Sequence, residues 1–250
     1  MNIDKYSQYN IYSTEFGKVW LLYGDLIKFL PNLKESSKIL EIWPWDWSFS
    51  FFISKYYWID KKNFDLIDKS KSVLEKLNTN DLTMGFNNHL TEALDFLNSN
   101  EQKYDLIIMR NIIEHMDKDY ISSLVNPILN SLKSWGKIFI ETPNLLNFKI
   151  GIPMFYSDYS HQTWFTSKSL FDAFYWNSNS KLSIDSFNYI RKIKIDWAIS
   201  TIKDAIRYSI EMLSAFSAYF NQRIYWTLSG EIKVTYTPLL ICVISKVTNE

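Results

Sequence analysis

The sequence ILEIWPWDWSFSFFISK, residues 39–55, sets the architecture expected of this chain. It reads as a short apolar strand over Lys38–Ile42, a tight turn, and a helix that begins near Ser48. Nucleotide cofactors are held where a strand turns into a helix in this way, and glycines there let the backbone approach the ligand. This turn instead carries tryptophan at alternate positions, Trp43, Trp45 and Trp47.

Composition suggests that these tryptophans stand in place of glycine. The chain has 10 Trp and only 6 Gly in 250 residues, whereas average usage predicts about 17 glycines. Trp135 falls in a turn before an apolar strand, and three other tryptophans end helix-like or aromatic segments, where glycine is common: Trp58, Trp176 and Trp226. We hypothesise that UGA codons meaning glycine in the source organism have been read as tryptophan. The alternative is a protein that is genuinely rich in tryptophan.

Charge and cysteine content bound the function. The 27 basic and 27 acidic residues balance, which argues against a broad nucleic-acid interface. A single Cys242 fits a reducing compartment, and no signal-peptide pattern is present, so we expect a cytoplasmic protein. No apolar run reaches the roughly 18 residues of a spanning helix, so we expect no stable membrane insertion. The mixed helix expected over Ile199–Phe220 leaves two interpretations open, peripheral membrane binding and packing against the sheet.

Strands and helices alternate along the chain, which predicts a parallel sheet covered on both faces. After the first strand, further strands are expected over residues 64–68, 82–85, 104–110, 136–141, 182–190 and 232–246. Helices are expected over residues 16–30, 48–57, 70–77, 91–98, 118–132 and 167–175, with a loop over 148–166. We see no internal repeat and no linker, so residues 1–250 are predicted to form a single domain.

Four segments occur in a characteristic order between residues 39 and 144. With glycine restored, the turn reads I-L-E-I-G-P-G-D-G-S-F and resembles motif I of the class I S-adenosylmethionine-dependent methyltransferases. The acidic end of FDLID (64–68), YDLIIMRNIIEHM (104–116) and GKIFIETPN (136–144) are similar to later segments of that family. YSDYSHQTWFTSKSL (156–170) is similar to a stretch found in members that act on saccharide or lipid-linked precursors. TYTPLLICVISK (235–246) resembles the last strand of that group.

The resemblance implies a Rossmann-like three-layer α/β sandwich. Its sheet would be seven-stranded and mostly parallel, with an antiparallel last strand. Residues 1–37 would form an N-terminal helical lead, 38–144 the cofactor-binding core, and 145–250 the substrate-side loop, helices and last strands. The spacing G-x-G-x-G at positions 43, 45 and 47 favours S-adenosylmethionine over a dinucleotide, whose third glycine would fall at Ser48.

Residues on the cofactor side follow from this resemblance. Glu41 would hold the amino-acid end of the cofactor, and Asp68 would accept its ribose hydroxyls or, alternatively, cap the helix near Ser70. Asn88, with its neighbour Asn87, would follow the third strand and recognise adenine. The turn itself supplies Trp43, Pro44, Trp45, Asp46 and Trp47, of which Asp46 could instead cap the next helix.

Residues on the acceptor side follow the fourth strand. Arg110 and Asn111 are expected to line the methyl-transfer site, because open α/β sheets bind ligands at the carboxyl edge. His115 and His161 are candidate general bases, although each could instead pack or bond locally. Asp158 and His161 alone are too few to indicate a metal site.

The sequence therefore predicts methyl transfer from S-adenosylmethionine to a small-molecule or saccharide acceptor, with oxygen as the favoured atom. The alternative applies if Trp43, Trp45 and Trp47 are genuine. Three indoles would then fill the cofactor's place, leaving a catalytically inactive, methyltransferase-like interaction protein.

Overall fold

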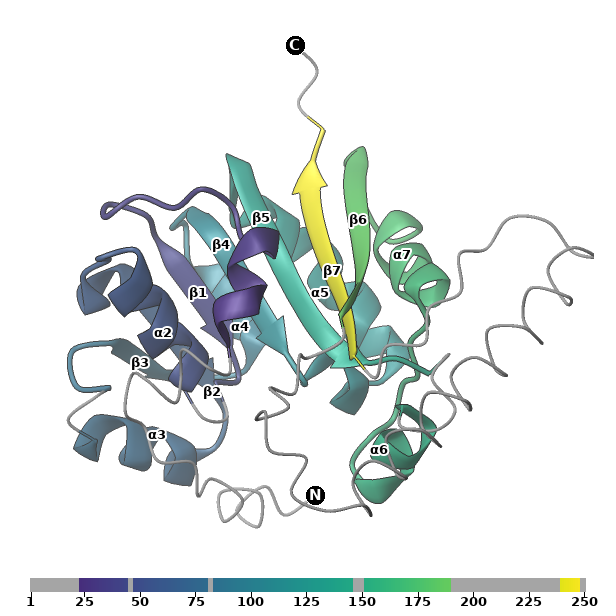
Figure 1. Ribbon diagram of the computed structural model, residues 1–250, viewed down its shortest axis with the longest axis horizontal. Coiled ribbons are helices and arrows are strands. Elements are labelled where there is room, and N and C mark those ends of the chain that lie inside the picture. The colour runs from purple at the N-terminus through teal and green to yellow at the C-terminus, as the bar shows by residue number, and fades with distance from the viewer. Residues whose placement is uncertain (1–22, 45–46, 81–82, 146–150, 190–238, 248–250) are drawn as a thin grey trace, which may run out of the picture.

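The computed structural model describes residues 23–44, 47–80, 83–145, 151–189 and 239–247. Its centre is a seven-stranded sheet in the order β3-β2-β1-β4-β5-β7-β6 (Figure 1). The strands are β1 Ile39–Ile42, β2 Phe64–Asp68, β3 Asn87–Leu90, β4 Tyr104–Arg110, β5 Leu132–Pro143, β6 Leu182–Tyr189 and β7 Leu239–Lys246. The first five strands pair in parallel, and β7 runs antiparallel to both β5 and β6. The predicted α/β architecture, with its mostly parallel sheet and antiparallel last strand, is confirmed.

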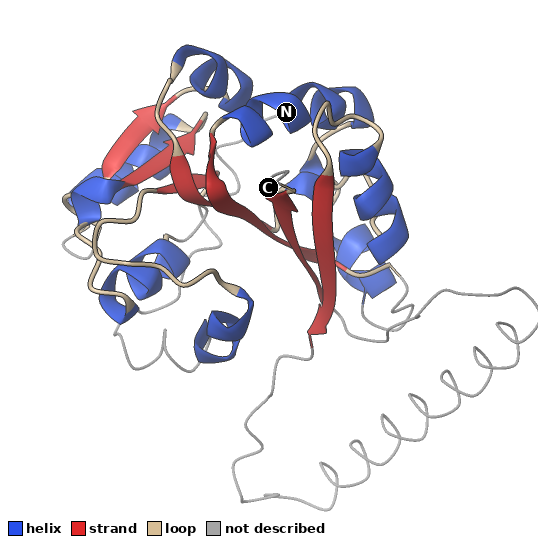
Figure 2. Cartoon of the chain, turned by 90° about the horizontal axis from the view of Figure 1, so that it is seen from above, coloured by secondary structure: helices blue, strands red, loops and turns tan. Residues whose placement is uncertain are grey.

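Helices cover both faces of the sheet (Figure 2). They are α2 Ser48–Tyr56, α3 Lys71–Thr79, α4 Ala93–Ser99, α5 Lys118–Asn130, α6 Gly151–Ser157 and α7 Ser167–Tyr175. One buried cluster joins one face of the sheet to α4, α5 and α7, and the other joins the opposite face to α2, α3 and the 3₁₀ helix Gly24–Phe29. The central strand β4 is apolar on both faces because both are covered.

Polar residues fix where several helices begin. The Ser70 hydroxyl accepts from the Val73 N–H at the start of α3, and Asp117 accepts from the Tyr120 N–H at the start of α5. Side chains that satisfy these otherwise unpaired N–H groups stabilise helix starts by about 1 kcal/mol each. They also place the preceding loops, which carry the candidate site.

Several sequence-based boundaries differ from the structure, and β5 extends beyond the expected residues 136–141 at both ends. The third strand was expected over residues 82–85, but residues 83–86 form a turn in which Gly85 has φ 99°, and β3 starts only at Asn87. Helix α6 lies in a segment expected to be a loop. The first expected helix is present in the described residues as the short 3₁₀ helix Gly24–Phe29.

The helix expected over 199–220 lies outside the described residues, as does Trp226. In the parts of the chain that the structure does describe, no helix has the length and apolar character needed to cross a membrane.

Candidate functional site

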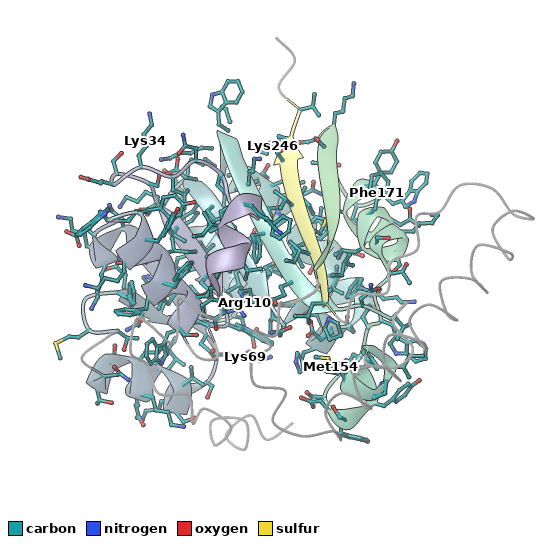
Figure 3. The ribbon with its side chains drawn as sticks, viewed as in Figure 1. Lys34, Lys69, Arg110, Met154, Phe171 and Lys246 are labelled. Atoms are coloured by element: carbon teal, nitrogen blue, oxygen red, sulfur yellow. The ribbon has the colours of Figure 1, made fainter. Side chains whose placement is uncertain are left out.

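The candidate site lies where the parallel strands end. The last residue of β1, Ile42, is in register with Ile67 of β2 and Met109 of β4, so the segments that follow these strands emerge together. This carboxyl edge is at the bottom of Figure 1, and Figure 3 shows Lys69 and Arg110 there. Ligands of open α/β sheets bind at this edge.

The turn after β1 has the backbone of a glycine turn. Trp43 has φ 55° and Trp47 has φ 43°, both in the left-handed region. A residue with a Cβ atom loses about 1–2 kcal/mol there, whereas glycine does not. Pro44 lies between them, and its carbonyl accepts from the Trp47 N–H at 3.3 Å. Trp45 and Asp46 lie outside the described residues, so their predicted roles stay predictions.

Positive φ angles elsewhere also fall on tryptophan. Among the described residues other than glycine, only Trp43, Trp47, Trp58 and Asn111 have positive φ. Trp58 follows α2 with φ 57°, and the Ile59 N–H bonds back to the Ser54 carbonyl at 3.0 Å. This is the Schellman helix end, in which glycine ordinarily takes the left-handed position. The expectation that Trp58 occupies a glycine-like place is therefore confirmed.

Trp176 ends helix α7 as expected, but its right-handed φ of −75° does not favour glycine. A glycine-like place is not supported for Trp135, which lies inside β5 rather than in a turn before the strand. Tryptophan therefore stands at a left-handed position in some of its described locations and not in others.

The indole of Trp43 fits its surroundings poorly. Its Nε1–H is buried and has no hydrogen-bond partner, which costs about 1–3 kcal/mol. The Lys69 ammonium lies 4.3 Å from the ring centroid and covers one face. Trp47 is buried, with its ring centroid 6.2 Å from that of Phe51. Both side chains thus take up room beside the turn.

Two predicted carboxylates are buried next to this turn. Glu41 lies in β1 and accepts a hydrogen bond from the Ser50 hydroxyl of α2, which fixes its position. Asp68 ends β2, and its Oδ1 accepts from the Ser70 N–H at 2.7 Å. Burial raises the pKa of Asp68 to about 6. Ser70 is the N-cap of α3, and Asp68 accepts from its N–H just before the helix, so part of the local role proposed for Asp68 is present.

The prediction that Asn88 follows the third strand is wrong. Asn88 lies within β3, in register with Leu66, so it does not reach the carboxyl edge. Its Nδ2 donates to Asn78 Oδ1 at 2.7 Å, while its Oδ1 is buried without a partner. The residue that does reach the edge is Glu92, which pairs with Lys69 at 3.4 Å. Sequence reasoning missed it because the strand boundary was misplaced.

Arg110 is the last residue of β4, and Asn111 follows it directly. Arg110 Nε donates to Glu141 Oε2 at 2.6 Å, and its guanidinium carbon lies 4.7 Å from the ring centroids of both Tyr23 and Phe49. The ion pair and the two cation–π contacts therefore hold Arg110 beside the start of the 3₁₀ helix Gly24–Phe29. Asn111 has φ 47°, and its N–H donates to the Glu141 carbonyl at 2.7 Å. Their predicted role in lining the methyl-transfer site stays a prediction.

The two candidate bases are brought together. His115 closes a short 3₁₀ helix, Ile113–His115, after β4, and His161 lies in the loop after α6. Their ring centroids are 4.5 Å apart. Burial, together with the neighbouring His161, lowers the pKa of His115 to about 4, so this ring is neutral at pH 7.

Glu114 completes this group, a role that sequence reasoning missed. Its side chain is buried, and its Oε2 accepts from the Thr142 hydroxyl at 3.0 Å. Burial raises the pKa of Glu114 to about 8. One ligand atom from each of Glu114, His115 and His161 lies within 4.8 Å of the others, so the group could hold a metal ion. The expectation that Asp158 and His161 are too few ligands did not count Glu114.

Hydrogen bonds tie the two segments that carry this group. The Gln162 and Thr163 N–H groups donate to the Glu114 carbonyl at 2.7 and 3.0 Å. The Gln162 side chain donates to the His115 carbonyl, and the Thr163 hydroxyl donates to the Met116 carbonyl, each at 2.7 Å. No sequence signal indicates that residues so far apart in the chain meet.

The sheet order and the reversed β7 define the class I S-adenosylmethionine-dependent methyltransferase fold. The chain is similar to a methyltransferase structure from Archaeoglobus fulgidus, with 17% identity, coverage of 93% of this chain and 95% of that one, and a TM-score of 0.61. It is also similar to the plantazolicin methyltransferase BamL, with 14% identity, coverage of 97% and 88%, and a TM-score of 0.54. The mitomycin 7-O-methyltransferase MmcR matches with 10% identity, coverage of 92% and 55%, and a TM-score of 0.54. No protein-family model and no curated protein sequence matches the chain.

Proposed function

We propose that the protein transfers a methyl group from S-adenosylmethionine to a small-molecule or saccharide acceptor. The observation that carries the proposal is the glycine-type backbone at Trp43 and Trp47, in the turn where this fold places its nucleotide cofactor. The plantazolicin methyltransferase was solved with S-adenosylhomocysteine, the product form of this cofactor. The saccharide preference rests on the sequence of residues 156–170, and we place the reaction in the cytoplasm.

The proposal includes the identity of the turn. Positions 43, 45 and 47 are glycine in the natural protein, encoded by UGA codons. Left-handed φ angles, a buried indole N–H without a partner and the low glycine content support this reading. Glycine at these positions removes the strain and opens the space beside the main chain.

The cofactor would contribute an electrophilic methyl group on a sulfonium. Glu41 and Asp68 would hold its amino-acid end and its ribose, since both carboxylates are buried beside the turn. The acceptor oxygen would lie near Asn111, with His115 or His161 positioned to take its proton. The protein supplies alignment and exclusion of water.

Calorimetry with S-adenosylmethionine on two forms of the chain tests the proposal. One form carries Trp43, Trp45 and Trp47, and the other carries glycine at all three positions. We expect binding only by the glycine form. Tight binding by the tryptophan form would contradict the steric argument, and no binding by either form would overturn the cofactor. Genuine tryptophans in the natural protein would leave the inactive interaction protein as the function.

A further inference from the structure

The group formed by Glu114, His115 and His161 has the donor set of a metal centre. We propose that these three residues bind one divalent transition-metal ion at the carboxyl edge of the sheet. Two imidazoles and one carboxylate form the His₂Glu set of open zinc sites, in which a water or substrate oxygen takes the remaining position. Ligand atoms from all three residues already lie within 4.8 Å of one another.

The hydrogen bonds around the histidines assign Nε2 of each ring as the atom that would bind an ion. His161 Nδ1 lies 2.7 Å from the Phe155 carbonyl, which can only accept, so Nδ1 carries the proton and Nε2 the lone pair. The Ser160 hydroxyl donates its proton to Asp158 at 2.6 Å, so it accepts from His115 Nδ1 at 2.7 Å. Metal-binding histidines ordinarily donate the other ring N–H to a carbonyl or polar group in this way.

Glu114 supplies negative charge where it is costly without a cation. Its side chain is buried, and among the described residues no lysine or arginine forms an ion pair with it. A buried carboxylate is stable when it is protonated, paired or bound to a metal. A divalent cation would compensate this buried charge.

The group is also held in place before any ion arrives. Hydrogen bonds from Gln162 and Thr163 to the backbone of residues 114–116 lock the loop that carries His161 onto the segment that carries the other two ligands. A site built in advance binds an ion without paying for the ordering of its ligands. Two imidazoles favour Zn²⁺ or Co²⁺ over Mg²⁺, which prefers oxygen ligands.

The site lies where the proposed methyl acceptor would bind. The following role for the ion rests on the proposed function, whereas the ion site itself does not. An acceptor hydroxyl could take the open coordination position, and a bound ion would lower its pKa, as it does for bound water. A histidine whose Nε2 binds the ion does not act as the base. The proton of the hydroxyl would then pass to solvent, and the oxygen lone pair would form the new bond to the methyl carbon as the carbon–sulfur bond breaks.

Titration with Co²⁺, followed by visible absorption, tests the site in the chain that carries Trp43, Trp45 and Trp47, without cofactor. We expect one Co²⁺ per chain, displaced by Zn²⁺ and not by Mg²⁺. His161→Gln and Glu114→Gln should each weaken binding by at least about 100-fold, and Ser160→Ala by about 10-fold, because ligands matter more than their supports. The control is His89→Gln, which should leave binding unchanged, since His89 lies on the edge strand β3 and bonds to Asp65 of β2.

A second measurement separates lost binding from lost folding. Zn²⁺ should raise the melting temperature of the unmodified chain and of His89→Gln, and should not raise that of a folded His161→Gln variant. The site is overturned if the unmodified chain binds no Co²⁺ or Zn²⁺, or if His161→Gln and Glu114→Gln bind as tightly as the unmodified chain. These failures are distinct from a failure of the glycine form to bind S-adenosylmethionine, which would overturn the cofactor and leave the ion site standing.

Discussion

The turn after β1 and the Glu114–His115–His161 group lie on the same edge of the sheet but differ in how well their side chains suit their backbone. The turn holds bulky tryptophans at left-handed φ angles, and one indole N–H is buried without a partner. At the histidine group, each side chain named has a polar partner, and the loops are tied by short hydrogen bonds. Native sequences usually agree with their local structure, and this misfit is the ground for our proposal that glycine is the natural residue at the turn.

The largest expected effect is on S-adenosylmethionine affinity and comes from the turn after β1. In the glycine form, restoring Trp43 alone should weaken S-adenosylmethionine binding by at least about 100-fold, or about 2.7 kcal/mol, because the indole occupies the ligand's space. Calorimetry measures this. Alanine at position 43 is the matched control, since it adds a Cβ atom without an indole. An equal loss with alanine would assign the effect to the backbone instead.

The next largest effect is the pH dependence of cofactor affinity, which reports the ionisation of Asp68 and not the shape of the turn. A ribose hydroxyl donates to the charged carboxylate, and burial places the pKa of free Asp68 at about 6. Below that pH the free Asp68 carboxyl must lose its proton before the ribose binds, so the affinity of the glycine form should fall about fivefold from pH 6 to pH 5 and level off above pH 7. Binding should be weaker and flat in Asp68→Asn. A wild-type affinity independent of pH would remove Asp68 from the ribose site.

A smaller effect is expected on stability, at two tryptophans that lie outside the proposed cofactor site. Trp58→Gly should raise the free energy of unfolding by about 1 kcal/mol, because it relieves a positive φ at an exposed position. Trp176→Gly is the matched control, equally exposed but at φ −75°, and should lower it by about 0.5–1 kcal/mol. Urea denaturation of both variants measures the difference. The same sign for both would break the argument from φ angles.

The smallest effect concerns the histidine side. Gln162→Ala removes one side-chain bond to the His115 carbonyl and should lower the free energy of unfolding by about 0.5–1 kcal/mol. The affinity of the glycine form for S-adenosylmethionine should not change, since the turn is a separate part of the edge. A coupled loss of cofactor affinity would show that the two regions are not independent.

Much of the fold is readable from the sequence because burial leaves a plain pattern. The strands β2 and β4 and the helix α7 were predicted to the residue, since apolar runs or a capping threonine mark their ends. The edge strand β3 was misplaced because it is polar, Asn87–Leu90, and gives no apolar run. Helix α6 was missed because Gly151 and Pro153 resemble loop residues.

The candidate site is less readable. Glu41 and Asp68 could be placed from a local motif, because each lies in or at the end of an apolar strand. The contact between His115 and His161 depends on a loop that returns to β4 through backbone hydrogen bonds, which no local pattern encodes. Glu114 gives no sign of burial in the sequence, since carboxylates are usually exposed.

The most direct test of the central claim is the mass of one peptide from the protein made by its source organism. Trypsin cleaves after Lys38 and Lys55, which releases residues 39–55 as a single peptide. Fragmentation mass spectrometry should find glycine at positions 43, 45 and 47, the first and last of which have left-handed φ angles. Tryptophan at all three positions would contradict the account and leave the fold without its cofactor site.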